Sequence, residues 1–110
     1  MNLLKRAGFK DLNQMTIDVA EKFFFAKKIQ ELKIDSFLAE SGLDEQCPYS
    51  SYLLKVQEAY ETLNDLEKNL INNEFFYQSY NNWWKPLYSK ATFYRYKKEA
   101  MRKFLRAMYD

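Results

Sequence analysis

Glycine and proline are scarce in this chain, and their scarcity constrains its fold more than any other feature of the sequence. Two residues of each type occur among 110. Sandwiches and barrels need many tight turns, which depend on these two residues, so an all-β fold is not expected. A content of 47% hydrophobic and 18% aromatic residues provides enough apolar surface for one packed core. We therefore expect a single all-α domain of about five helices.

The residue inventory excludes several classes of chemistry. The chain has no His and only one Cys. It therefore lacks the usual general base, the Ser–His and Cys–His nucleophile pairs, and the ligands of a standard zinc site. The glycine-rich loops that bind nucleotide phosphates are also missing from the sequence. We expect a binding protein that is not an enzyme and that uses no cofactor and no metal.

The sequence also predicts where in the cell the protein is located. It contains no apolar run long enough to span a membrane, and its first residues lack the pattern of a signal peptide. Cys47 is alone and cannot form an intrachain disulfide, and its neighbours Asp44 and Glu45 do not favour a reactive thiolate. We expect a cytoplasmic protein without a membrane partner, in which Cys47 has no special role.

The first long helix is expected in the N-terminal segment, residues 1–47. Asp11 is a candidate N-cap with Gln14 as its capping-box partner, and apolar residues then recur at steps of three and four to about residue 32. Residues 23–25 are three consecutive phenylalanines, which cannot all face one core. The segment is therefore expected either to complete the core or to pair with a second copy of the chain in a homodimer.

Further elements follow from spacing and cap residues. Asn64, with Glu67 three residues later, is a candidate N-cap. Trp83 and Trp84 are expected to contribute at least one side chain to the core. The expected elements are a short helix over 34–41 ended by Gly42, a linker over 42–50 that contains Pro48, a helix over 53–63, a helix from 65 that residues 75–77 could prolong, and a short helical turn over 80–85 closed by Pro86.

The net charge of +2 conceals an uneven distribution. Residues 1–84 contain nine Lys or Arg and thirteen Asp or Glu, a balance of −4, whereas residues 85–110 contain eight and two, a balance of +6. A basic block at one end of a small domain is typical of proteins that bind a polyanion. The competing interpretation is a solvated helix face that keeps the protein soluble.

The C-terminal helix concentrates this charge. Ser89 is its expected N-cap, because it precedes a long run without Gly or Pro. A helical projection places one apolar group towards the core: Phe93, Tyr96, Ala100, Phe104, Ala107 and Met108. The opposite arc holds Ala91, Arg95, Lys98, Arg102 and Arg106, with Glu99 beside them. Lys97 projects onto the apolar side, so its ammonium would have to reach outward to contact a ligand.

This arrangement suits a recognition helix in the major groove of double-stranded DNA, whose N-terminal residues lie nearest the base edges. Backbone amides near Ser89 would add an anion contact. The expected readers of base edges are Lys90, Thr92, Tyr94 and Arg95. The expected phosphate contacts are Lys97, Lys98, Arg102, Lys103 and Arg106.

The stretch from Tyr88 to Ala100, with its serine cap, Thr92, Tyr94 and Arg95, resembles the recognition helix of sigma-factor C-terminal regions. It is most similar to the small ArpU-type phage regulators of low-GC Gram-positive bacteria and their wall-less relatives. Residues 63–71 resemble the helix that opens that region. The resemblance implies that residues 48–110 form a helix-turn-helix of the sigma region 4 kind, which binds specific duplex DNA in bacterial transcription regulation and could contact RNA polymerase.

The match departs from the family pattern in two places. Pro86, Leu87 and Tyr88 stand where the turn normally has a glycine or small residue, and the segment before them is rich in Asn and Trp. Two other functions remain open. The chain could be a helical interaction module that docks on a partner such as RNA polymerase through its aromatic residues. It could also bind RNA by stacking Tyr and Trp side chains on bases.

Overall fold

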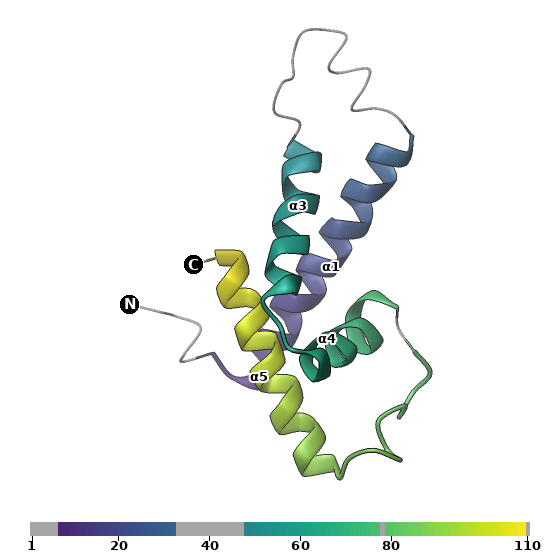
Figure 1. The fold of residues 1–110 in the computed structure, drawn as a ribbon, viewed down its shortest axis with the longest axis vertical. Helices are drawn as coiled ribbons and strands as arrows, with labels where there is room; N and C mark the ends of the chain where they lie inside the picture. Colours follow the sequence, from purple (N-terminus) through teal and green to yellow (C-terminus); the bar gives the residue numbers. More distant parts are fainter. Residues whose placement is uncertain (1–6, 33–47, 78, 110) are drawn as a thin grey trace, which may run out of the picture.

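The computed structural model describes residues 7–32, 48–77 and 79–109, and the protein is all-α over these residues (Figure 1). The all-α prediction is thereby confirmed. The expected helix over 34–41, its stop at Gly42, and Cys47 lie outside the described residues. The helical elements are α1 (Phe9–Glu31), α3 (Pro48–Glu61), α4 (Asp65–Ile71), the π-helical turn η2 (Asn72–Phe76) and α5 (Lys90–Tyr109).

α1 begins before the predicted cap. Its N-cap is Gly8, which makes no side-chain cap bond, and the Gly8 carbonyl accepts from the Leu12 amide at 3.0 Å. The prediction of an Asp11–Gln14 capping box was therefore wrong. Asp11 lies in the first turn instead, where a carboxylate is favoured by the helix dipole, and the Gln14 amide donates to Asp18 at 3.0 Å.

α3 begins at Pro48, inside the expected linker. Proline suits the first turn of a helix, because the N–H that it lacks would have no partner within the helix there. α3 runs antiparallel to α1 (Figure 1). The Tyr52 hydroxyl of α3 donates to the Val19 carbonyl of α1 at 3.4 Å, and the Lys22 ammonium lies 4.8 Å from the centre of the Tyr52 ring.

α4 begins with the predicted capping box. The Asn64 side chain accepts from the Glu67 amide at 2.8 Å, and the Glu67 carboxylate accepts from the Asn64 amide at 2.8 Å. α4 continues without a break into η2, where the Tyr77 amide donates to the Asn72 carbonyl at 2.7 Å. The predicted prolongation of this helix towards residue 77 is confirmed, in the wider π form, and Phe75 of η2 is buried.

The core is assembled around α5, which packs against α1, α3 and α4. α1 supplies Leu12, Val19 and Ala20 to this core, so the N-terminal segment does complete it. The largest side chains with essentially no exposure are Phe93, Phe104, Leu12, Leu70, Ile71, Met101, Leu105 and Met108.

Residues 77–89 connect η2 to α5. The expected helical turn over 80–85 is instead a series of turns that spans 81–87. Asn82 has a φ of 62°, in the left-handed region that Asn tolerates better than most residues. Trp83 is buried, which confirms one core tryptophan, and Trp84 stacks on Phe93 with ring centroids 4.4 Å apart. The turn of a helix-turn-helix has about three to four residues, so this longer connection leaves the predicted helix-turn-helix unconfirmed.

Candidate nucleic-acid interface

The N-terminal end of α5 is capped by Ser89, as the sequence predicts. Its Oγ accepts from the Thr92 amide at 3.2 Å and donates to the Thr92 hydroxyl at 2.9 Å. The Ser89 carbonyl accepts from the Phe93 amide at 2.9 Å. These hydrogen bonds therefore fix the position at which α5 begins.

The buried side of α5 is rotated from the predicted one by about 45°, at about 100° per residue. Tyr96 and Ala107 are only partly buried, whereas Met101 and Leu105, which the prediction missed, are fully buried. The rotation arises because α5 is covered from several directions, by α1, α3 and α4. The buried residues of α5 are Phe93, Ala100, Met101, Phe104, Leu105 and Met108.

The opposite side of α5 carries the cationic residues. Arg95, Lys98, Arg102 and Arg106 follow one another at steps of three and four, which places them along one side of the helix. Arg95 and Arg106 are exposed, and Lys98 and Arg102 are partly exposed. Lys90 is exposed in the first turn. We call Arg95, Lys98, Arg102 and Arg106 the cationic face.

Lys97 is a correction to the predicted set of phosphate contacts. Its ammonium donates to the Glu74 carboxylate at 2.7 Å, and its side chain is only 12% exposed. The ammonium also lies 5.5 Å from the centre of the Phe9 ring and 5.2 Å from that of Phe75. Lys97 lies near the centre of the buried side of α5, so its charge is paired inside the protein and is not offered to a phosphate.

Glu74 is a residue that sequence reasoning missed. Besides Lys97, its carboxylate accepts from the Trp83 indole N–H at 2.8 Å. One carboxylate of η2 therefore holds both α5 and the connection over 77–89. No local pattern marks Glu74 in the sequence, because its partners lie 9 and 23 residues away along the chain.

Two other cations of α5 are bonded to carboxylates. Lys103 donates to the Glu67 carboxylate of α4 at 3.0 Å, and Arg102 donates to Glu99, one turn before it, at 2.7 Å. The Lys103 side chain keeps 46% of its surface exposed. Glu67 thus caps α4 and also bonds α5, whereas the Arg102–Glu99 pair lies within the outer surface of α5.

Tyr94, which was predicted to contact base edges, is partly exposed and partly packed against other rings. It is 41% exposed, and its ring lies edge-on to Phe9 at 5.2 Å and to Trp84 at 6.4 Å. These contacts bring the start of α1 and the connection over 77–89 against the N-terminal end of α5.

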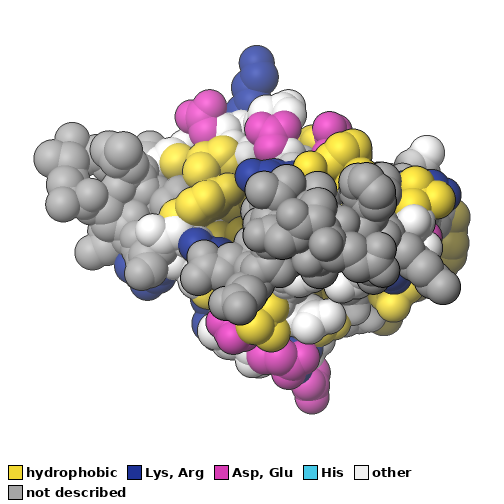
Figure 2. All heavy atoms as spheres, turned by 90° about the horizontal axis from the view of Figure 1, so that it is seen from above, with side chains coloured by type: hydrophobic (Ala, Val, Ile, Leu, Met, Phe, Trp, Pro, Cys, Tyr) yellow, Lys and Arg dark blue, Asp and Glu magenta, His cyan; other side chains and the backbone are white. Residues whose placement is uncertain are grey.

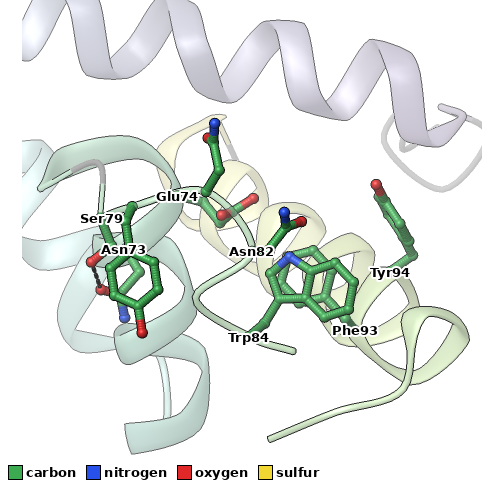
Figure 3. Close-up of a pocket in the computed structure, with 9 residues that line it drawn as sticks. Asn73, Glu74, Ser79, Asn82, Trp84, Phe93 and Tyr94 are labelled. Carbon is green, nitrogen blue, oxygen red and sulfur yellow. Dashed lines mark hydrogen bonds between the residues drawn. The ribbon is translucent and has the colours of Figure 1, made fainter. Parts of the chain in front are cut away.

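A cavity of about 670 Å³ opens beside this end of α5 (Figure 3). Trp84, Phe93 and Tyr94 form its aromatic wall, and Asn73, Glu74 and Asn82 supply polar groups. Figure 3 shows the Asn73 and Ser79 side chains bonded to each other on its other side. Trp83 is buried and one face of Trp84 is covered by Phe93, so stacking on a base would have to use the part of Trp84 that lines the cavity.

In the described part of the chain, no group of three or more acidic, Cys or His residues lies close enough together to hold a metal ion. Within the same residues, no helix combines the length and the apolar character needed to cross a membrane. No protein-family model matches the chain, and no curated protein or solved structure matches it significantly.

Proposed function

We propose that this chain binds specific sites on double-stranded DNA through α5 and that it acts in transcription regulation. One observation carries the proposal, namely that the cationic face occupies the side of α5 that the core leaves uncovered. Arginine and lysine side chains in such a row can contact phosphates, and the arginine fork can bond two acceptors of a guanine.

The shape of α5 supports insertion into the major groove. The N-terminal half of α5 points away from the paired α1 and α3 (Figure 1). This end carries Lys90 and Arg95, which would reach base edges, while Arg102 and Arg106 follow where phosphate contacts are expected. The major groove is about 12 Å wide and accommodates one helix.

A salt titration tests the proposal. Affinity for a fluorescent duplex should fall with salt with a log–log slope of about −3, if Lys98, Arg102 and Arg106 of this face each neutralise one phosphate. A single strand of the same sequence is the control, and the duplex should bind more tightly. Binding that is absent or insensitive to salt would contradict the proposal, and a preference for single strands would favour RNA binding.

Docking on a protein such as RNA polymerase is the second candidate. The observation that favours it is that three cations of α5, namely Lys97, Arg102 and Lys103, already bond carboxylates of the same chain. Internal pairing reduces the charge left for phosphates. This candidate predicts retention on immobilised RNA polymerase together with weak, salt-insensitive binding to DNA.

A further inference from the structure

A groove of about 730 Å³ lies between α1 and α3 and ends at η2. Phe24 and Lys27 line it from α1, and Leu54 and Glu58 line it from α3. Phe76 lies at the end formed by η2. Its ring packs on Phe23 at 5.3 Å and on Phe104 at 6.2 Å, so the floor of the groove is continuous with the core.

The walls of the groove leave large apolar side chains in water. Phe24 is 43% exposed and Leu54 is 56% exposed. Figure 2 shows apolar side chains at the surface between acidic and basic ones, seen from the end of the molecule where α1 and α3 project. Grouped exposed apolar residues with a polar rim are typical of an interaction site.

The C-terminal part of α1 and the N-terminal part of α3 project as a pair beyond α4 and α5 (Figure 1). Two helices alone cannot bury their apolar sides on both faces, whereas four helices can enclose a common core.

Opposite charges lie at opposite ends of the exposed apolar pair. α1 and α3 are antiparallel (Figure 1). Lys27 lies one turn beyond Phe24 along α1, about 4.5 Å further, and Glu58 lies one turn beyond Leu54 along α3, about 6 Å further. A two-fold axis that lies in the contact plane, passes between Phe24 and Leu54 and crosses the Lys27–Glu58 direction at right angles places Lys27 of one copy near Glu58 of a second copy, and the reverse. The surface is complementary in charge to itself.

We propose that two copies of this chain associate through this groove about such an axis. Phe24 and Leu54 of each copy lie at the centre, and two Lys27–Glu58 ion pairs between copies lie at the rim. An isologous contact of this kind needs no other partner, because each copy supplies both the apolar and the charged surface. The inference is independent of DNA binding, and its test uses no nucleic acid. If both proposals hold, the pair presents two α5 helices to a two-fold symmetric DNA site.

Charge reversal in solution tests this proposal on the full-length chain. Sedimentation equilibrium should show a dimer for the wild type. Lys27→Glu and Glu58→Lys should each weaken self-association by at least about tenfold, because like charges then meet twice. An equimolar mixture of the two variants should recover dimers, since each contact in a mixed pair joins opposite charges. Recovery in trans separates a contact between copies from one within a chain.

Matched controls come from neighbouring residues that do not line the groove. Lys28→Glu and Phe25→Ser alter exposed side chains next to Lys27 and Phe24. They should leave self-association unchanged, whereas Phe24→Ser should abolish it with the same helical circular dichroism as the wild type. A wild type that stays monomeric at every concentration, a mixture that does not recover dimers, or a Phe24→Ser variant that still dimerises would each overturn the proposal.

Discussion

The Nζ atom of Lys97 lies 2.7 Å from Oε1 of Glu74, and this ion pair joins α5 to η2 inside the protein. The two side chains are 12% and 19% exposed, so water screens them less than it screens a pair on the surface. The loss of one partner leaves the other charge enclosed by the rings of Phe9, Phe75 and Phe93. Removing one member of the pair should therefore lower the free energy of unfolding more than replacing both members with uncharged residues.

The first prediction follows from that asymmetry. Glu74→Gln should lower the free energy of unfolding by about 3 kcal/mol, because it leaves the Lys97 ammonium without its carboxylate. The double variant Glu74→Gln with Lys97→Met should be more stable than Glu74→Gln alone, because no charge remains enclosed. Urea denaturation followed by tryptophan fluorescence measures both. Equal stabilities of the single and the double variant would contradict the prediction.

The adjacent residues Lys97 and Lys98 provide a test within α5 that controls for overall charge. Lys98→Ala should weaken binding to duplex DNA and reduce the slope of log affinity against log salt by about one, because Lys98 belongs to the cationic face. Lys97→Met removes the same charge but should leave the slope unchanged, because this ammonium is paired with Glu74. Anisotropy titrations at several salt concentrations decide the point. Equal changes of the slope for both variants would contradict the prediction, because Lys97 and Lys98 would then contribute equally to DNA binding.

Arg95 and Arg102 should differ in their effect on sequence preference. Arg95→Ala should cost about 1–3 kcal/mol on the preferred site and reduce discrimination between bases, because Arg95 lies near the N-terminal end of α5. Arg102→Ala should weaken all duplexes alike, as expected for a phosphate contact. Competition between a selected site and a scrambled duplex measures the difference. Lys28→Ala, which removes a cation from α1, is the control and should have no effect on either duplex.

The capping box of α4 should contribute measurably to stability. Asn64→Ala should lower the free energy of unfolding by about 1 kcal/mol, because the Glu67 amide loses its acceptor. Glu67→Gln should cost less than that, because a glutamine can still accept from the Asn64 amide and only the exposed ion pair with Lys103 is lost. Thermal denaturation of the two variants gives the order, and a larger loss for Glu67→Gln would contradict it.

Tyr52 should make stability depend on pH in the alkaline range. Burial between α1 and α3, and secondarily the neighbouring Tyr109 hydroxyl, raise the pKa of Tyr52 from 10.0 to about 12. The folded protein thus holds this proton more tightly than the unfolded chain does. The contribution to stability is complete below pH 10 and disappears as the pH rises towards 12.

Two measurements check the Tyr52 prediction. Phenolate absorbance should show a titration step near pH 12, and Tyr52→Phe should remove that step. The variant should also lose less stability than the wild type between pH 10 and 12. A wild type and variant with parallel stability curves over this range would contradict the prediction.

The features that the sequence predicts correctly depend on neighbours along the chain. Asn64 and Ser89 are caps because an acceptor side chain and an amide three residues later are brought together by the backbone itself. The same reasoning failed for Asp11, because α1 continues one turn further back to Gly8. The helical period also placed Arg95, Lys98, Arg102 and Arg106 on one side of α5 correctly, since that pattern needs no knowledge of packing.

The features that the sequence does not predict depend on tertiary contacts. Met101 and Leu105 are buried because α5 is covered by α1, α3 and α4, which no period within α5 reveals. Lys97 is inside because Glu74, from another element, bonds its ammonium. The connection over 77–89 was expected to contain a helical turn, but its conformation follows from Trp83 and Trp84 packing against Glu74 and Phe93. The sequence pattern alone did not indicate these contacts.

The π-helical turn η2 makes the chain sensitive to changes of length at this place. It spans Asn72–Phe76, and the Tyr77 amide bonds the Asn72 carbonyl five residues back, where an α-helix bonds the carbonyl four residues back. Its register turns Phe75 into the core and Glu74 towards Lys97. Deleting one residue from η2 would rotate both away from their partners by about a quarter turn. A deletion of the same size near Leu87, which is exposed, would leave that register intact. Natural or engineered variants of this chain should therefore differ in length between residues 77 and 89 far more readily than between 72 and 76.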